Sequence, residues 1–380
     1  MKGPLDGVRV IELAGLGALP FGTLKLADMG ADIIRVDRVS DVPDAPQERP
    51  RSAWDRGHRS IAVDLKQPAG VETVLRLAES ADVILEAFRP GVVERLGLGP
   101  DAVMARNERI VYGRLTGWGQ VGPLSQSAAH SLNYEAITGV THSIGPLGGP
   151  PVPALTVLGD FAGGGLNLAY GVVCALLEAR TSGKGQVVDA AMIDGVVSLL
   201  TPFYSMHQLG MHTDEIGTNL FDGGAPFYAI YETSDGKYVS VAPIEPHFYA
   251  LLIQKLGLAS EDLPDQNDRA RWPELKERFA AVFKTRTRDE WCAELEGTDA
   301  CFAPVLTLAE AQQHPHQVAR ASFAEGTPMP EPAPAPRLSR TPGRPGPSPR
   351  WQGADTDTVL AESGFSADEI ESLRAERAIA

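Results

Sequence analysis

The first 200 residues alternate between short apolar runs and helix-like segments, and this alternation restricts the possible folds more than any other feature of the chain. Apolar runs typical of buried strands occupy residues 8–13, 32–36, 60–65, 81–87 and 109–115. Helix-like segments at residues 20–29 and 71–80 separate some of them. Near-continuous apolar strands joined by helices predict a parallel sheet covered on both faces. We therefore predict a Rossmann-like α/β domain over residues 1–200.

The later part of this predicted domain is less regular. A glycine-rich stretch runs from Thr116 to Gly159, and a loop of that length inside a compact domain usually has a function. A long apolar helix is expected at Phe161–Arg180, a strand at Gln186–Met192, and a further helix over about residues 194–209.

A smaller α+β domain is predicted over residues 222–310. Its first two strands, at residues 228–233 and 238–242, flank Asp235-Gly236, which is a strong hairpin turn signal. Helices are expected at residues 246–256, 272–283 and 289–296, followed by a short strand at 302–306.

Residues 325–380 are predicted to form an extended strap and a last helix. Nine of the chain's 30 prolines lie between Pro328 and Pro349, which favours a semi-rigid extended segment. Ser366 and Glu369 have the spacing of a capping box, so a helix is expected at residues 366–377. Both pieces need a surface to pack on, and we expect them to return to the large domain, with a partner subunit as the alternative.

Composition and charge exclude several classes of function. A net charge of −15 opposes broad contact with nucleic acid, although a local basic pocket could still bind a small polyanion. The three cysteines are too scattered for a disulfide framework or a paired metal motif. Neither a signal peptide nor an apolar run of about 20 residues is evident, so we expect a cytoplasmic protein without a membrane partner.

The turn after the first strand resembles a dinucleotide motif only weakly. Gly15 and Gly17 fit the pattern G-x-G-x-x-G, but its third glycine falls on Pro20. Asp37 stands where a ribose-binding acid would be, yet Arg35 and Arg38 beside it suit a phosphate better. A tight turn that serves packing is the better interpretation of the glycines.

Basic residues recur where the predicted strands end. Arg38, Lys66 and Arg89 follow the second, third and fourth strands, and Arg95 comes shortly after. Open α/β sheets bind ligands at this edge, and Arg and Lys are suited to phosphate groups. Two interpretations of these basic residues remain open: they belong to an ordinary solvated surface, or they form a site for a phosphorylated ligand.

Three further side chains are candidates for chemistry. His130 stands alone, and a lone histidine is more often a structural group than a catalyst. Asp160 is expected at the N-terminus of the long apolar helix, where it could be an N-cap or a base beside free N–H groups that stabilise a developing enolate. Glu245 precedes a helix, either as a favourable carboxylate at its start or as the partner of a histidine across an interface.

Several motifs, taken together, give the chain a family resemblance. They are PLDGVRVIELAGLG, RPGVVERLGLGP, TGWGQVGP, the segment around His130, GDFAGGG, SGKGQVVDAAMIDG, GGAPFYAIYETSDGKYVSVAPIEP and QNDRARWPEL. In this order they resemble the family III CoA-transferase superfamily and, within it, the α-methylacyl-CoA racemases. The resemblance covers nearly the whole chain and weakens only in the proline strap and the last helix.

The resemblance implies an interlocked homodimer that binds an acyl-CoA thioester, with the active site between one chain's large domain and the other's small domain. It implies that His130 and Asp160 are the proton-transfer pair and that Glu245 reaches the histidine from the partner chain. No metal or redox cofactor is implied, because CoA is bound as part of the substrate. The implied CoA contacts are Arg38, Val63, Asp64, Leu65, Lys66, Ala87, Phe88, Arg89, Arg95, Ala129, Ser131, Leu132, Asn133 and Tyr134, which include the four basic residues found above.

The expected reaction is inversion of the α-carbon of a 2-methylacyl-CoA. Removal of a proton from one face and its return on the other requires two bases, for which Asp160 and His130 are proposed. Met192, Met206 and Met211 could offer an adaptable surface to the acyl chain or could belong to the core. The alternatives are a CoA-transferase with an acyl-Asp160 intermediate and a non-catalytic CoA-binding scaffold.

The chain departs from the racemase pattern at two positions. Ser131 stands where the resemblance implies an aspartate after the histidine, and Thr156 where it implies an asparagine. Both residues can still form hydrogen bonds, but the missing carboxylate alters the local charge. Rate and substrate range could therefore differ.

Overall fold

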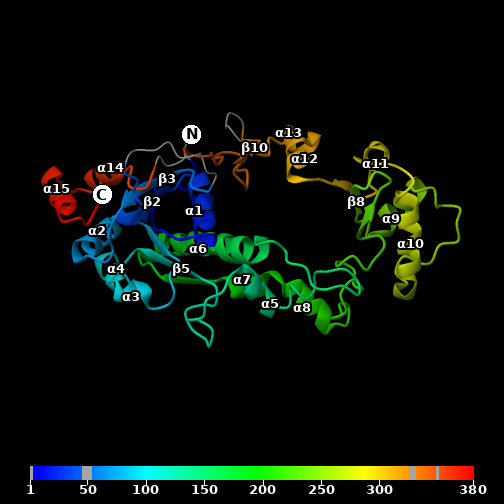
Figure 1. Cartoon of the computed structure of the whole chain (residues 1–380), viewed down its shortest axis with the longest axis horizontal. Coiled ribbons are helices and arrows are strands. Elements are labelled where there is room, and N and C mark those ends of the chain that lie inside the picture. Colours follow the sequence, from blue (N-terminus) through cyan, green and yellow to red (C-terminus); the bar gives the residue numbers. More distant parts are fainter. Residues whose placement is uncertain (1–2, 45–53, 325–330, 348–350) are drawn as a thin grey trace. The chain divides into compact units, whose positions relative to one another are not determined.

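A computed structural model describes residues 3–44, 54–324, 331–347 and 351–380 (Figure 1). The chain separates into two compact units. The large unit comprises Met1–Thr138, Leu155–Leu199 and Ala321–Ala380. The small unit comprises Gly139–Ala154 and Leu200–Arg320.

A six-stranded parallel sheet forms the centre of the large unit and confirms the predicted α/β class. The strand order is β3-β2-β1-β4-β5-β6, which is that of a doubly wound Rossmann-type sheet. The strands are β1 Arg9–Leu13, β2 Asp32–Asp37, β3 His58–Ala62, β4 Val83–Glu86, β5 Val111–Thr116 and β6 Val187–Ala191.

Helices cover both faces of this sheet, which is why its strands are apolar on both sides. In β1, Val10 belongs to the core cluster on one face and Ile11 to the cluster on the other. The first cluster takes in helices α1 Ala18–Asp28 and α6 Asn167–Ser182. The second takes in helices α2 Pro68–Ala78, α4 Pro100–Arg106, α14 Thr356–Glu362 and α15 Ala367–Ala375.

The glycine-rich stretch predicted as a loop contains a short helix, α5 Ser131–Ile137. The long apolar helix also begins earlier than expected. A π-helical segment, η2 Val157–Leu166, precedes α6 without a break. In η2 the Phe161 N–H donates to the Thr156 carbonyl, five residues back, at 3.4 Å. Asp160 therefore lies inside the helix and not at its N-cap, and π-helical segments of this kind are frequent at functional sites.

Close backbone contacts hold η2 in place. A Cβ atom at Gly195, in α7 Met192–Leu199, would overlap the backbone of Gly163. A Cβ at Gly22 in α1 would lie 2.8 Å from the carbonyl oxygen of Gly165. The glycines that argued for a loop instead let two helices approach η2 closely.

Together η2 and α6 make a 26-residue helical run, Val157–Ser182, which by length and composition alone could cross a bilayer. A core helix meets the same criterion, and this one packs against α1 and β5 in the large unit. The expectation of no membrane partner stays a prediction.

The small unit contains a three-stranded antiparallel sheet covered by helices. Strands β7 Ala229–Glu232, β8 Tyr238–Val241 and β9 Phe302–Val305 lie in that order. Gly236, with φ of +75°, forms the predicted hairpin turn. Helices α9 Pro246–Lys255, α10 Trp272–Phe283 and α11 Arg288–Leu295 supply a core in which Phe279, Phe283 and Trp291 are buried. The predicted helix over residues 194–209 is divided between α7 and α8 Thr201–Gln208.

The described part of the C-terminal segment packs on the large unit. The Asp64 N–H donates to the Ala378 carbonyl at 2.8 Å, and the Ala380 N–H donates to that of Ala62 at 3.2 Å. Ser366 and Glu369 form the predicted capping box of α15. Of the predicted strap, residues 325–330 and 348–350 lie outside the described residues.

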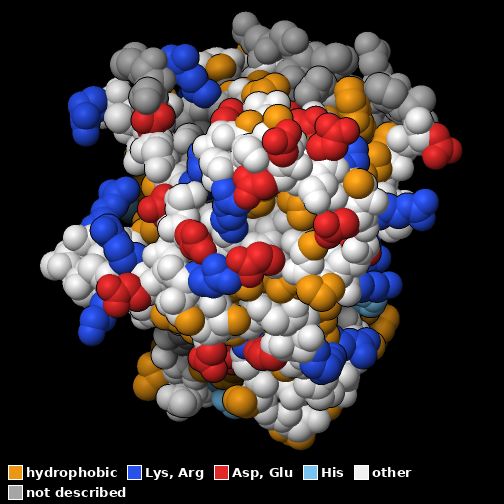
Figure 2. All heavy atoms as spheres, turned by 90° about the vertical axis from the view of Figure 1, so that its left-hand side faces the viewer, with side chains coloured by type: hydrophobic (Ala, Val, Ile, Leu, Met, Phe, Trp, Pro, Cys, Tyr) orange, Lys and Arg blue, Asp and Glu red, His pale blue; other side chains and the backbone are white. Residues whose placement is uncertain are grey.

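Acidic and basic side chains are interspersed on the face of the molecule drawn in Figure 2. The negative charge of the chain is therefore not gathered in one patch on this face. Ion pairs in the large unit give examples of this mixing. Arg76 pairs with Glu369 at 2.8 Å, and Arg106 pairs with Glu72 and Glu79, each at 2.8 Å.

Candidate active site

A cavity of about 1010 Å³ opens in the large unit at the carboxyl end of the sheet. Loops that follow β1, β4 and β5 line it, together with the segment before α5, and this is where parallel α/β sheets bind ligands. The lining residues are Ala14, Gly15, Leu16, Gly17, Ala18, Arg35, Asp37, Arg38, Asp41, Ala87, Phe88, Arg89, Pro90, Leu115, Thr116, Gly117, Trp118, Ser125, Ser127, Ala128, Ala129, His130, Asn133, Tyr134, Asp160, Met192 and Gln352.

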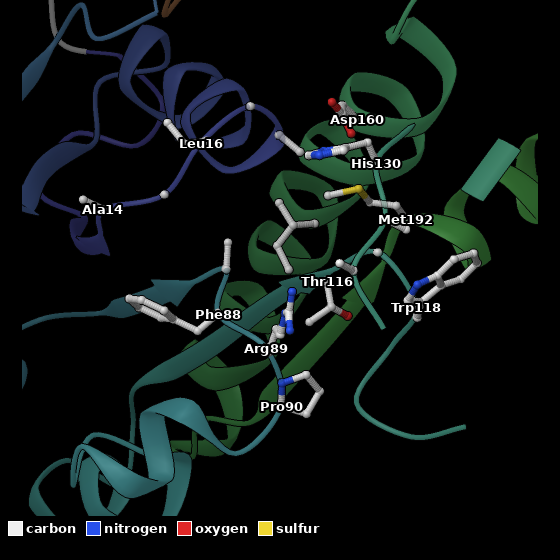
Figure 3. A pocket seen from close by; sticks show the side chains of 18 of the residues that line it. Ala14, Leu16, Phe88, Arg89, Pro90, Thr116, Trp118, His130, Asp160 and Met192 are labelled. Atoms are coloured by element: carbon white, nitrogen blue, oxygen red, sulfur yellow. The ribbon is translucent and has the colours of Figure 1, made fainter. Parts of the chain in front are cut away.

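His130 and Asp160 meet in this cavity. Figure 3 shows them grouped with Met192 at one end, while Phe88, Arg89 and Pro90 lie at the other. His130 is the N-cap residue of α5, and its N–H donates to the Asn133 side-chain oxygen at 3.1 Å. This hydrogen bond holds the backbone of His130, while its side chain is exposed and accessible to a ligand.

Asp160 is half-buried and lies close to the glycine turn after β1. A Cβ at Gly17 would lie 3.6 Å from Oδ2 of Asp160, and φ of +66° at Gly17 itself favours glycine. Burial raises the pKa of the Asp160 carboxyl, and nearby Glu135 raises it further, whereas His130 acts to lower it. The site thus contains a carboxylate with increased proton affinity beside a histidine.

Tyr134 lines the same cavity and is affected by the charges of Asp160 and Arg89. Its pKa is raised by burial and by the charge of Asp160, and Arg89 opposes the rise. The Tyr134 hydroxyl donates to the Ala129 carbonyl at 2.6 Å, and its ring packs edge-on against Trp118 with centroids 4.7 Å apart. These contacts hold the loop before α5 against the loop after β5.

The amides at the start of the Asp160 helix are not free as expected. The Gly159 N–H donates to Glu135 at 2.8 Å, and the Asp160 N–H donates to the Ser131 hydroxyl at 3.2 Å. The Phe161 N–H is bonded to the Thr156 carbonyl. The prediction that these groups would meet an enolate oxygen is wrong, because the helix begins before Asp160 and α5 provides side-chain acceptors.

Ser131 is buried and does not line the cavity. Its hydroxyl donates to Oε1 of Glu135 at 2.8 Å, and Glu135 is fully buried. A carboxylate therefore lies beside position 131 after all, four residues later on the same face of α5.

A second cavity, of about 630 Å³, shares Ala14, Asp37, Arg38 and Phe88 with the first. The predicted basic residues Arg38 and Lys66 line it, and the C-terminal segment adds Arg377. Its lining residues are Ala14, Val36, Asp37, Arg38, Val39, Ser40, Val63, Asp64, Leu65, Lys66, Gln67, Phe88, Leu96 and Arg377.

Most of the predicted contact residues line one of these two cavities. Those at the first are Ala87, Phe88, Arg89, Ala129, Asn133 and Tyr134. Those at the second are Val63, Asp64, Leu65 and Lys66, and Arg38 and Phe88 belong to both. Arg95, Ser131 and Leu132 line neither. Arg95 is exposed beside Gly91, and the Leu132 side chain is also exposed.

Glu245 lies in the small unit as the N-cap residue of α9, where its exposed side chain makes no capping hydrogen bond. Across the described parts of both units, no three His, Cys, Asp or Glu side chains are grouped so that they could hold a metal ion.

Two residues of interest were missed by sequence reasoning. Glu135 lies four residues after Ser131, a spacing that would place the two side chains on the same face of a helix. This could be inferred only once α5 was recognised as a helix. Arg377 has no such signal, because 311 residues separate it from Lys66 along the chain and only the folded C-terminus brings them to one cavity.

Comparisons with known proteins agree with this architecture. The family model described as "CoA-transferase family III" matches residues 5–356. The chain is 46% identical over 380 residues to the α-methylacyl-CoA racemase of Mus musculus and 44% identical over 377 residues to that of Homo sapiens. Each alignment covers 99% of this chain and 97% of the relative. The crystal structure of a CAIB/BAIF family protein from Brucella suis matches with a TM-score of 0.81 and 25% identity, over 96% of this chain and 100% of that one.

Proposed function

The chain belongs to CoA-transferase family III, and from this premise we propose that it is a racemase that inverts the α-carbon of 2-methylacyl-CoA thioesters. Two relatives named α-methylacyl-CoA racemase are 44–46% identical over nearly the full chain. The observation that carries the proposal is the presence of His130 and Asp160 together in one cavity of the large unit. An acid and a base at one end of a cavity are the groups that inversion through an enolate requires.

In the proposed mechanism, Asp160 removes or delivers the α-proton on one face and His130 acts on the other. The raised pKa of Asp160 makes its carboxylate a stronger base than an exposed aspartate. Proton removal leaves an enolate conjugated with the thioester, and the opposite residue returns a proton to the same carbon. No electron leaves the substrate, so the reaction needs no redox cofactor.

The second cavity suits the nucleotide part of CoA. Its lining contains three basic residues, Arg38, Lys66 and Arg377. They outnumber the two acidic residues, Asp37 and Asp64, and their side chains favour phosphate groups. Because it shares lining residues with the first cavity, an extended molecule could occupy both, with its thioester at His130 and Asp160. Binding energy from such a handle would align the reacting carbon.

A homodimer is part of the proposal. Leu166, Tyr170, Val173 and Leu177 form an exposed apolar stripe along η2 and α6, with Tyr170 and Leu177 each 69% exposed. Apolar stripes of this kind commonly mark protein interfaces. In the dimer, Glu245 of the partner subunit would approach His130 and orient its imidazole.

The rival function, CoA transfer between carboxylic acids, would use Asp160 as a nucleophile that carries the acyl group. Incubation with a single 2R- or 2S-methylacyl-CoA in deuterated water separates the two. A racemase is expected to racemise the substrate at C2 and to incorporate deuterium there without any added carboxylic acid acceptor. Absence of exchange, together with transfer of CoA to an added carboxylate, would contradict the proposal.

Substitution of the pair gives a second test. His130→Ala and Asp160→Asn should each reduce racemisation at C2 by about 10²–10⁴-fold, the usual contribution of a general acid or base. A transferase would lose activity with Asp160→Asn but would tolerate His130→Ala far better. A non-catalytic scaffold would be inactive before substitution, so neither change would have a measurable effect.

A further inference from the structure

Glu135 is a buried carboxylate that the proposed proton transfer does not use. It is fully buried in α5, and its Oε1 accepts hydrogen bonds from the Ser131 hydroxyl and the Gly159 N–H, both at 2.8 Å. Its Oε2 is buried without a hydrogen-bond partner among the described residues. Burial of an incompletely satisfied carboxylate is costly, so its presence calls for a compensating role.

The contacts of Glu135 lead to the reacting groups on both sides. The Ser131 hydroxyl donates to Glu135 and accepts from the Asp160 N–H at 3.2 Å. The amides of residues 159 and 160 are thus both held by α5. The same helix begins at His130, its N-cap residue, directly before Ser131.

The backbone of η2 is shaped to permit this attachment. A Cβ at Gly159 would overlap the Ser131 hydroxyl and would lie 3.0 Å from Oε1 of Glu135. Only glycine therefore lets this turn of η2 approach Ser131 and Glu135 so closely. Ser131, Glu135 and Gly159 fit one another as a set.

We propose that Ser131 and Glu135 form a clamp that fixes the distance between His130 and Asp160, with Glu135 as a positioning residue for proton transfer. The inference rests on the proposed function, because it assumes that these two side chains act on the same carbon. Two hydrogen bonds join α5 to this part of η2, one from the Asp160 N–H to Ser131 and one from the Gly159 N–H to Glu135, and the hydrogen bond between Ser131 and Glu135 links them. Misplacement of a catalytic group by about 1 Å can cost about 10²-fold in rate, so the clamp acts on turnover and not on binding.

The test compares Glu135→Leu, Glu135→Gln and Ser131→Ala in the full-length enzyme, measuring deuterium exchange at C2 of a 2-methylacyl-CoA. Glu135→Leu removes the acceptor at similar volume and is expected to lower kcat by about 10²-fold with KM changed less than about threefold. Glu135→Gln keeps an oxygen for Ser131 and Gly159 and should restore kcat to within about fivefold of the native enzyme. Ser131→Ala removes the acceptor of the Asp160 N–H and one donor to Glu135, but it keeps the hydrogen bond from the Gly159 N–H to Glu135. It should lower kcat by about tenfold at unchanged KM.

The double variant Ser131→Ala/Glu135→Leu should be slower than Glu135→Leu by less than the roughly tenfold effect of Ser131→Ala alone, because the two changes share the hydrogen bond between Ser131 and Glu135. Glu72→Gln, on the surface of α2, is a matched acid-to-amide control and should be fully active. Unchanged kcat in Ser131→Ala would overturn the clamp, and so would equal losses in Glu135→Gln and Glu135→Leu. If Glu135→Leu fails to fold, Ser131→Ala decides the outcome. Full activity of His130→Ala or Asp160→Asn would instead contradict the proposed function itself.

Discussion

Asp160 combines burial with a neighbouring histidine, and this determines the expected dependence of rate on pH. Burial is the main cause of its raised pKa, and His130 only partly opposes it. Because the carboxylate form is the base, exchange should fall as pH decreases through a value above the ordinary aspartate pKa of about 3.9. The acid limb of kcat for deuterium exchange measures this value. A midpoint at or below the ordinary pKa would contradict the argument.

The same raised pKa predicts a stability gain when the charge is removed. A folded-state pKa above the unfolded value means that the folded protein binds the proton more tightly, so folding is penalised once pH rises through the folded pKa. Asp160→Asn should therefore have an equal or higher Tm at pH 7 despite its loss of activity. Below the unfolded pKa the difference should disappear. Thermal unfolding at pH 7 and at the lowest pH where the fold persists checks both statements.

At this scale, residue types were easier to predict than their contacts. His130 and Asp160 were identified together through the resemblance, and the structure places both in one cavity. The prediction of free amides beside Asp160 was wrong. Neither the π-helical start of the helix nor the burial of Glu135 beside Gly159 can be recognised from the amino-acid sequence. Contacts between segments 24 residues apart depend on packing that propensities do not encode.

At the level of elements, η2 depends on close approach by α7. A Cβ at Gly195 would overlap the Gly163 backbone, which cannot shift as a side-chain tip can. Gly195→Ala should destabilise the protein by about 1–3 kcal/mol and lower activity, since it displaces the helix that carries Asp160. Gly171→Ala, in α6, is the control, because its Cβ would meet only a methyl group of Val188 at 2.8 Å. Denaturant unfolding compares the two, and an equal loss would refute the explanation.

Periodic elements were predicted well where a pattern of apolar residues was strong, as in β2, α10 and β8. The glycine-rich stretch was predicted poorly, because glycine signals both a turn and a close helix crossing. The sequence alone could not distinguish these uses before the neighbouring helices were known.

At the scale of the whole molecule, the C-terminal segment contributes to the second cavity. We expected it to return to the large domain, with a partner subunit as the alternative, although the packing of a proline-rich strap has no periodic signal. In the structure, Ile379 bridges to Val63, and the Arg377 carbonyl accepts from the Gln67 side chain at 3.0 Å. Arg377 thereby joins Lys66 at the cavity.

This placement predicts a role for Arg377 in substrate binding. Arg377→Ala should raise KM for an acyl-CoA by up to about fivefold at low salt with kcat unchanged, because an exposed charge contact contributes about 1 kcal/mol at most. The effect should shrink as salt screens the charge. Arg374→Ala is the matched control, because Arg374, near the end of α15, pairs with Asp357 of α14 at the surface and lines neither cavity. A pantetheine thioester that lacks the nucleotide should be insensitive to both changes. If Arg377→Ala impaired that truncated substrate equally, the segment would act on the fold and not on the nucleotide.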